Sequence, residues 1–222
     1  MRGPDWRASL RWWSRRGGVD GQVYWRRQPR QPGRIVVLWD VSGSMQEYVG
    51  LYAPWIYRLA VLYPRVGVFP FGVTWQDATR VMRGSFAEAW QRVDDQSGIW
   101  GAGTAIGAAL GSWNVARGGH WLSGSTLVII ISDGWDVGRP EQLEEALRAI
   151  RGRAGRLVWI NPLMATPGFS PKTRALRVAN KFADLMASGH NPAALLQLVQ
   201  RWQTADSSRR TPWLARGETD AT

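Results

Sequence analysis

A short apolar run that ends in a carboxylate and two alternating hydroxyls constrains this chain more than any other feature. Residues 35–39 are all apolar, and Asp40, Ser42 and Ser44 follow at alternate positions in a turn that contains Gly43. An apolar run this short is typical of a buried strand in a parallel sheet, and such sheets bind ligands at the carboxyl ends of their strands. Hard oxygen donors without His or Cys suit Mg²⁺ or a similar cation, so the pattern predicts a metal site.

Two later segments carry oxygen donors that can complete such a site. A glycine-containing segment, 101–107, opens an apolar helix-like stretch and offers the hydroxyl of Thr104, and a second apolar run, 126–131, leads to Asp133. If the two strands are neighbours, Asp40 and Asp133 converge on one ion. Taken alone, D-x-S-x-S is equally compatible with a turn in which Asp40 bonds its own backbone. The three segments together predict a metal site made of Asp40, Ser42, Ser44, Thr104 and Asp133.

These motifs resemble the metal-ion-dependent adhesion site of von Willebrand factor A (VWA) domains. The resemblance rests on D-x-S-x-S at residues 40–44, on Thr104, and on Asp133 within the triplet S-D-G. Two further segments, S-D-G-W-D at 132–136 and R-L-V-W-I-N-P at 156–162, are similar to the CoxE-like bacterial branch. The resemblance covers roughly residues 34–202.

The resemblance implies a divalent-metal-dependent protein-binding module and not an enzyme. In the family, the two loop serines and often the threonine touch the metal, while the aspartates act directly or through waters. One position of the ion stays open, and an Asp or Glu of a partner protein fills it. CoxE-like proteins resemble accessory factors that work beside AAA+ ATPases of the MoxR type in metalloenzyme maturation or complex assembly. The implied cofactor is Mg²⁺, with Mn²⁺ or Ca²⁺ as alternatives.

The apolar periodicity predicts an α/β fold. We expect a Rossmann-like VWA fold, with a mostly parallel central sheet, one antiparallel edge strand and helices on both faces. Parallel strands are expected at 35–40, 66–71, 126–131, 157–160 and 182–186. Helices are expected at 48–62, 85–93, 104–115, 140–150 and 192–202, with a helical turn at 173–180. Segment 75–82 is expected to be the antiparallel edge strand, because the link before it is too short for a crossover helix. Pro54 is expected in the first turn of its helix.

The distribution of charge and the periodicity of apolar residues divide the chain into three parts. Residues 1–33 are predicted to be a basic Arg/Trp-rich N-terminal arm, residues 34–203 the VWA domain, and residues 204–222 a flexible C-terminal tail. The net charge is +11, and residues 1–34 hold nine arginines against two aspartates, with four tryptophans interleaved. The arm is interpreted either as a solvated or partner-docked segment, or as a contact with nucleic acid or an acidic protein.

The composition excludes several classes of protein. The chain of 222 residues has no cysteine, which removes thiolate catalysis and thiolate zinc sites. No apolar stretch approaches the ~20 residues of a membrane span, and the N-terminus lacks the apolar core of a secretory signal. We therefore expect a cytoplasmic protein.

Two other functions stay open at this stage. A metal-dependent phosphoester hydrolase would need a water-activating carboxylate beside the ion, and only Asp133 or Asp136 could serve. Asp136 is expected either to pair with an arginine or to face the metal loop, and Trp135 either to pack at the rim or to stack on a ligand. A nucleic-acid-binding module would act through the basic arm. The chain contains neither a P-loop nor a dinucleotide-binding glycine motif.

Overall fold

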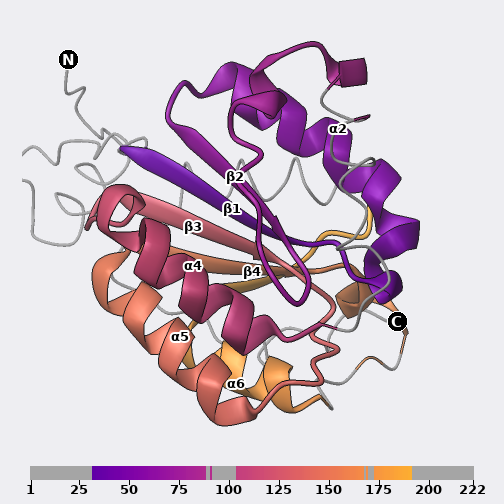
Figure 1. The fold of residues 1–222 in the computed structure, drawn as a ribbon. Helices are drawn as coiled ribbons and strands as arrows, with labels where there is room; N and C mark the ends of the chain where they lie inside the picture. The colour runs from indigo at the N-terminus through magenta and orange to yellow at the C-terminus, as the bar shows by residue number, and fades with distance from the viewer. Residues whose placement is uncertain (1–31, 89–90, 92–103, 168, 170–172, 192–222) are drawn as a thin grey trace, which may run out of the picture.

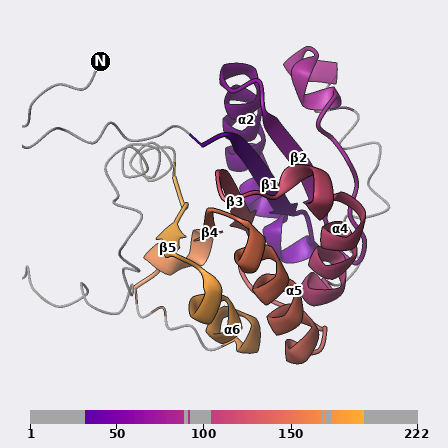
Figure 2. The same cartoon turned by 90° about the vertical axis from the view of Figure 1, so that its left-hand side faces the viewer.

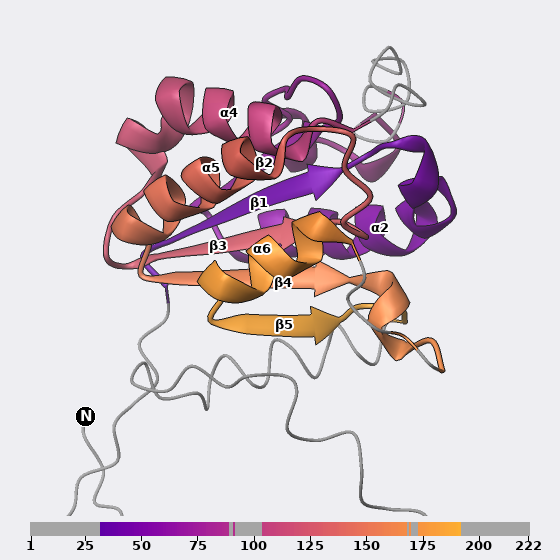
Figure 3. The same ribbon diagram turned by 90° about the horizontal axis from the view of Figure 1, so that it is seen from below.

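The molecule is built around a parallel sheet of five strands. The structure, a computed structural model, describes residues 32–88, 91, 104–167, 169 and 173–191. The strand order is β2-β1-β3-β4-β5, and neighbouring strands are paired in parallel, so that their carboxyl ends lie at one edge (Figure 3). The strands are β1 (Arg34–Asp40), β2 (Val66–Phe71), β3 (Thr126–Ile131), β4 (Arg156–Asn161) and β5 (Leu185–Ser188).

Helices cover both faces of the sheet, as the parallel pairing requires. Helix α2 lies on one face, and α4, α5 and α6 lie on the other (Figures 1 and 2). The helices are α2 (Gln46–Leu62), α4 (Ile106–Trp121), α5 (Pro140–Arg153) and α6 (Arg174–Phe182). The 3₁₀ turns of the described residues are η1 (Gly43–Met45), η2 (Val81–Arg83) and η4 (Pro162–Ala165).

The continuous apolar runs are explained by burial on both faces. Along β1, Val37 packs with the α2 side of the core, and Val36 packs with the side formed by α4 and α5. Every residue of β2 and β3 is buried. A strand that is covered on both faces needs apolar residues at every position, in contrast to the alternation of a half-exposed strand.

The register of the two central strands places the candidate site. Trp39 of β1 is paired with Ile131 of β3. Asp40 and Ser132 therefore come next at the same level of adjacent strands. The polar residues begin where the apolar strands end, at the sheet edge that parallel α/β folds use for ligands.

Most of the predicted elements are confirmed, and some are longer or shifted. Helix α4 continues to Trp121 where the prediction ended at 115, and the predicted turn at 173–180 is a full helix, α6. The last described strand is β5, a few residues later than 182–186. The amide of Glu88 donates to the hydroxyl of Ser85 at 3.2 Å, which is the bond expected of a serine that caps the start of the predicted helix 85–93.

The predicted antiparallel strand at 75–82 is not formed. An isolated antiparallel bridge joins Phe71 and Trp75, a further backbone bond runs from the Ala78 amide to the Val68 carbonyl, and the segment ends in η2. The Val68 amide donates to the Thr79 hydroxyl, and the Asp77 carboxylate accepts the Thr79 amide. Side-chain oxygens thus take backbone bonds that a strand would use for its ladder.

The predicted position of Pro54 is also wrong. Helix α2 follows directly on η1 and begins at Gln46, so Pro54 lies well inside it. Proline cannot donate a hydrogen bond to the carbonyl of Gly50, four residues earlier. Both residues are exposed, so water can satisfy that carbonyl.

Several predictions lie outside the described residues. These concern the arm through residue 31, the glycine segment 101–103, the helix at 192–202 and the tail at 204–222. Within the part of the chain that the structure describes, each helix is too short or too polar to span a bilayer.

Gly107 offers a test of how closely α4 and α5 pack. A Cβ on Gly107 would lie 2.4 Å from the backbone nitrogen of Leu143, whereas one on Gly111 would meet nothing nearer than 4.0 Å. We expect Gly107→Ala to lower the free energy of unfolding by about 2 kcal/mol, because the α5 backbone must move. Gly111→Ala is the matched control and should raise it by about 0.5–1 kcal/mol. Urea unfolding checks both, and equal effects would contradict the close approach.

Candidate metal centre

The carboxylate of Asp40 is the centre of a buried hydrogen-bond network. Its side chain has no exposed surface. One oxygen, Oδ1, accepts the backbone amide of Ser42 at 2.9 Å, and Oδ2 accepts the hydroxyl of Ser132 at 2.7 Å. Asp40 therefore bonds its own loop and also joins the ends of β1 and β3.

The loop after β1 brings the two serine hydroxyls together. The Oγ atoms of Ser42 and Ser44 are 3.3 Å apart, and Ser44 is exposed while Ser42 is buried. Val41 and Met45, which flank the serines, are buried, and the Met45 amide donates to the Ser42 carbonyl. The apolar residues anchor the loop and leave the hydroxyls at the edge of the sheet.

Two side chains of β4 hold the loop that carries Asp133. The indole N–H of Trp159 donates to the carbonyl of Ser132 at 2.9 Å, and the amide of Asn161 donates to the carbonyl of Asp133 at 3.0 Å. The Asp133 carboxylate is buried, and its Oδ1 accepts the backbone amide of Trp135 at 3.0 Å. This carboxylate is consequently fixed in direction before any ligand binds.

Gly134 is required by both its conformation and its surroundings. Its φ of 79° lies in the left-handed region that favours glycine, and a Cβ would lie 2.6 Å from Leu176 of α6. Its amide donates to the hydroxyl of Ser132 at 3.0 Å. The glycine of S-D-G thus lets the loop turn sharply against α6.

Thr104 is attached to the same loop by its backbone. Thr104 is buried, and its carbonyl accepts the amide of Val137 at 2.9 Å. The carboxylate of Asp136 accepts the amides of Ile106 at 3.0 Å and Gly138 at 2.9 Å. Asp136 therefore caps the start of α4 and secures Thr104 to the segment that follows Asp133.

Neither of the two predictions for Asp136 describes this role. No arginine pairs with Asp136 among the ion pairs of the described residues, and its Oδ1 bonds the α4 backbone. A sequence signal exists, because α4 starts after Ala105, which has no side chain that could cap it. Trp135 is 64% exposed and is not packed at the rim. Ser132, Trp159 and Asn161 were likewise not predicted to position the site.

The site concentrates negative charge in a buried place. Burial raises the pKa of Asp40 to about 6, and the nearby Asp133 carboxylate adds to the rise, although hydrogen bonds from Ser132 and Ser42 oppose it. Among the described residues, no Lys, Arg or His forms an ion pair with either carboxylate. Two neighbouring buried carboxylates of this kind call for a cation.

The donor set fits a hard divalent cation. The described residues contain no group of three or more His, Cys, Asp and Glu side chains that could hold a metal, so the candidate site needs hydroxyl oxygens beside its two carboxylates. Carboxylate and hydroxyl oxygens suit Mg²⁺. The bonds above connect the three predicted segments, and the candidate ligands are Asp40, Ser42, Ser44, Thr104 and Asp133.

The pKa of Asp40 leads to a prediction for the metal-free protein. The unfolded chain loses the Asp40 proton near the ordinary pKa of 3.8, whereas the folded chain keeps it to about 6. Between these values the folded state binds more protons, so folding stability falls as pH rises through this window. Relative to the Asp40→Asn variant, the native chain should lose about 3 kcal/mol of its free energy of unfolding across this pH window. Urea unfolding in EDTA from about pH 4 to pH 7 measures this loss, and parallel profiles for the two proteins would contradict it.

Comparisons with known proteins agree with this architecture. In the mussel byssus, proximal thread matrix protein 1 is 19% identical with a TM-score of 0.52, over 78% of this chain and 47% of that chain. BatB, a conserved hypothetical protein from Bacteroides thetaiotaomicron, is 17% identical with a TM-score of 0.50, over 77% and 97%. The PilB minor pilin from Streptococcus sanguinis is 13% identical with a TM-score of 0.50, over 90% and 68%. At such identities the likeness shows the fold alone.

A family comparison goes further than the fold. No curated protein sequence matches the chain. The family described as "VWA domain containing CoxE-like protein" matches residues 1–195, which include the five candidate ligands and the residues before β1. The chain therefore belongs to the CoxE-like family of VWA domain proteins.

Proposed function

We propose that the chain is a divalent-metal-dependent protein-binding module. Ser42, Ser44 and Thr104 would offer neutral oxygens to the ion, and Asp40 and Asp133 would offer charge. A bound Mg²⁺ would supply an electrophilic position that a carboxylate of a partner protein can occupy. The observation that carries the proposal is the buried pair of carboxylates, which forms no ion pair with a cationic side chain of the described residues and lies beside two hydroxyls.

Preorganisation of the ligands supports this function. Asp40 accepts two hydrogen bonds, and the carbonyl and carboxylate of Asp133 accept one each. Ligands that are already oriented lose little conformational entropy when the ion binds. The adjacent Ser44 is exposed, so a macromolecular partner can reach the edge of the site.

The arrangement favours binding over phosphoester hydrolysis. Hydrolysis would need a carboxylate that is free to take a proton from water. One oxygen of Asp136 accepts the amide of Ile106 in α4 and the amide of Gly138 in its own loop, and one oxygen of Asp133 accepts the Trp135 amide. The bonds of both acids therefore suit a fixed scaffold.

Membership of the CoxE-like family guides the choice of partner and location. We propose that the partner is an AAA+ ATPase of the MoxR type, and that the module assists metalloenzyme maturation or complex assembly. Mg²⁺ is the favoured ion, with Mn²⁺ and Ca²⁺ as alternatives. A cytoplasmic location is consistent with a chain that has no cysteine and that would meet an ATPase there.

Metal binding is the first test. Isothermal titration calorimetry with Mg²⁺ should detect one site, and Asp40→Ala should abolish it because the buried charge is lost. Ser44→Ala should weaken Mg²⁺ binding, whereas Ser125→Ala, an exposed serine near the other end of β3, should not. Circular dichroism verifies that each variant is folded. Unchanged Mg²⁺ affinity in Asp40→Ala would exclude the proposed site.

Complex formation is the second test. Affinity capture with the full chain should recover an AAA+ ATPase in the presence of Mg²⁺, and the ATPase should be absent in EDTA. Thr104→Ala should reduce recovery without unfolding the chain, because it removes one hydroxyl and keeps the backbone bond to Val137. Equal recovery of the ATPase in EDTA would show that the complex does not depend on a metal.

A further inference from the structure

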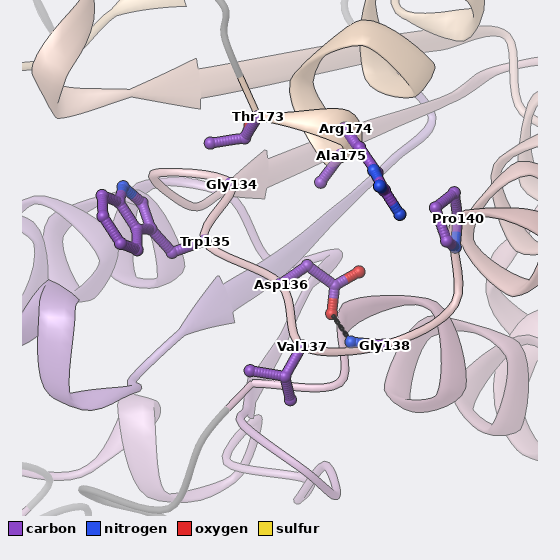
Figure 4. Close-up of a pocket in the computed structure, with 9 residues that line it drawn as sticks. All are labelled: Gly134, Trp135, Asp136, Val137, Gly138, Pro140, Thr173, Arg174 and Ala175. Carbon is purple, nitrogen blue, oxygen red and sulfur yellow. Dashed lines mark hydrogen bonds between the residues drawn. The ribbon is translucent and has the colours of Figure 1, made fainter.

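A pocket opens beside the candidate metal centre, one residue beyond Asp133. Its volume is about 390 Å³, and it lies between the loop that joins β3 to α5 and the first turn of α6 (Figure 4). The sequence predicts no pocket at this place, although a ligand stacked on Trp135 is one of the two interpretations of that residue. The side chains that matter here are Trp135, Asp136, Val137, Pro140, Thr173 and Arg174.

Two apolar side chains of this loop are exposed although their backbones are fixed. Trp135 is 64% exposed and Val137 is 81% exposed. The Trp135 amide is bonded to the Asp133 carboxylate, and the Val137 amide is bonded to the Thr104 carbonyl. Single exposed apolar residues need no explanation. Two of them on one fixed loop, around one pocket, have the character of an interface hot spot.

The charges around the pocket favour an anionic partner. Arg174 lies over the pocket opposite Pro140 (Figure 4), and within the described residues its guanidinium forms no ion pair. Arg139, just before α5, is exposed and also has no ion pair there. The opposing charge is Asp136, and its Oδ1 accepts two backbone amides. Available positive charge thus lies next to exposed apolar surface.

We propose that the partner of the metal centre is an acidic peptide segment that is read by this pocket. The inference rests on the proposed function, because one carboxylate of the segment is the metal-binding group. An apolar side chain beside that carboxylate packs on Trp135 and Val137. A second carboxylate pairs with Arg174. Asp133 is bonded to the Trp135 amide, and Trp135, Val137 and Arg174 line one pocket, so one short segment can make all three contacts.

A peptide array tests the proposal with the full chain. Octapeptides with a fixed central glutamate and varied flanks are probed in Mg²⁺ and in EDTA. Selected peptides should carry an apolar residue within two positions of the glutamate and a second acid. Trp135→Ala should weaken the best peptide about tenfold, as expected for a hot-spot residue. Thermal unfolding confirms that the variants remain folded.

Matched controls separate the pocket from general surface effects. Val137→Ala should weaken binding of the best peptide, whereas Val115→Ala, an equally exposed valine on α4, should not. Arg174→Gln should remove the preference for the second acid, whereas Arg177→Gln, an exposed arginine of the same helix, should leave it.

The outcomes distinguish this inference from the proposed function. If the peptides need Mg²⁺ but Trp135→Ala and Arg174→Gln bind them like the native chain, the pocket proposal is wrong and metal-dependent binding stands. If the peptides bind through Trp135 in EDTA, the pocket reads peptides and the proposed function fails. An array from which the native chain selects nothing, or a single-stranded oligonucleotide that displaces the peptides, would overturn the pocket proposal.

Discussion

The hydrogen bond between the Ser132 hydroxyl and the Asp40 carboxylate is the contact on which the candidate site depends. At 2.7 Å it joins the ends of β1 and β3, the two central strands of the sheet. The Ser132 hydroxyl also accepts the amide of Gly134, and its carbonyl accepts the indole of Trp159. Ser132 thus connects the loop after β1 to the loop after β3, and it also connects the loop after β3 to β4. Without it, the parallel register would still bring the strand ends together, but the direction of Asp40 would be set only by its own loop.

Burying the charge of this network is unfavourable, and the packing of the sheet must offset that free energy. Removing Asp40 from water disfavours its charged form, and Asp133 disfavours it further, so the pKa of Asp40 rises to about 6. Protein interiors seldom keep a buried carboxylate without a cation or several donors, unless the site has a ligand to bind. The apolar strands supply the stability, with β1, β2 and β3 buried almost throughout. Stability is concentrated in the middle of the sheet, and the costly polar groups are confined to its edge.

The sequence predicts the parts of this structure that depend on continuous patterns. The runs at 35–39 and 127–131 are apolar at each position because both faces of the sheet are covered, and the polar residues that follow them predict the site edge. Local chemistry overrides pattern at 75–82, where Asp77 and Thr79 capture backbone amides and prevent a strand. The role of Asp136 depends on a bond to Ile106, thirty residues earlier in the chain, and Ala105 indicates only that the cap of α4 must come from another segment. The role of Asn161 is likewise not local, because its bond to the Asp133 carbonyl requires knowing that β4 lies beside β3.

The loop between β3 and α5 combines the two proposed binding activities. Asp133 belongs to the candidate metal centre, and Trp135 and Val137 are exposed, while Asp136 holds the start of α4. The exposed residues are bonded through their own amides to Asp133 and to Thr104, which are proposed metal ligands. In the proposed function, fixing these ligands therefore also fixes the surface that reads the peptide. Coupling between two binding events is reciprocal, so the factor by which the ion strengthens partner binding is also the factor by which the partner strengthens binding of the ion. Such a module would hold its metal most tightly when its partner is bound.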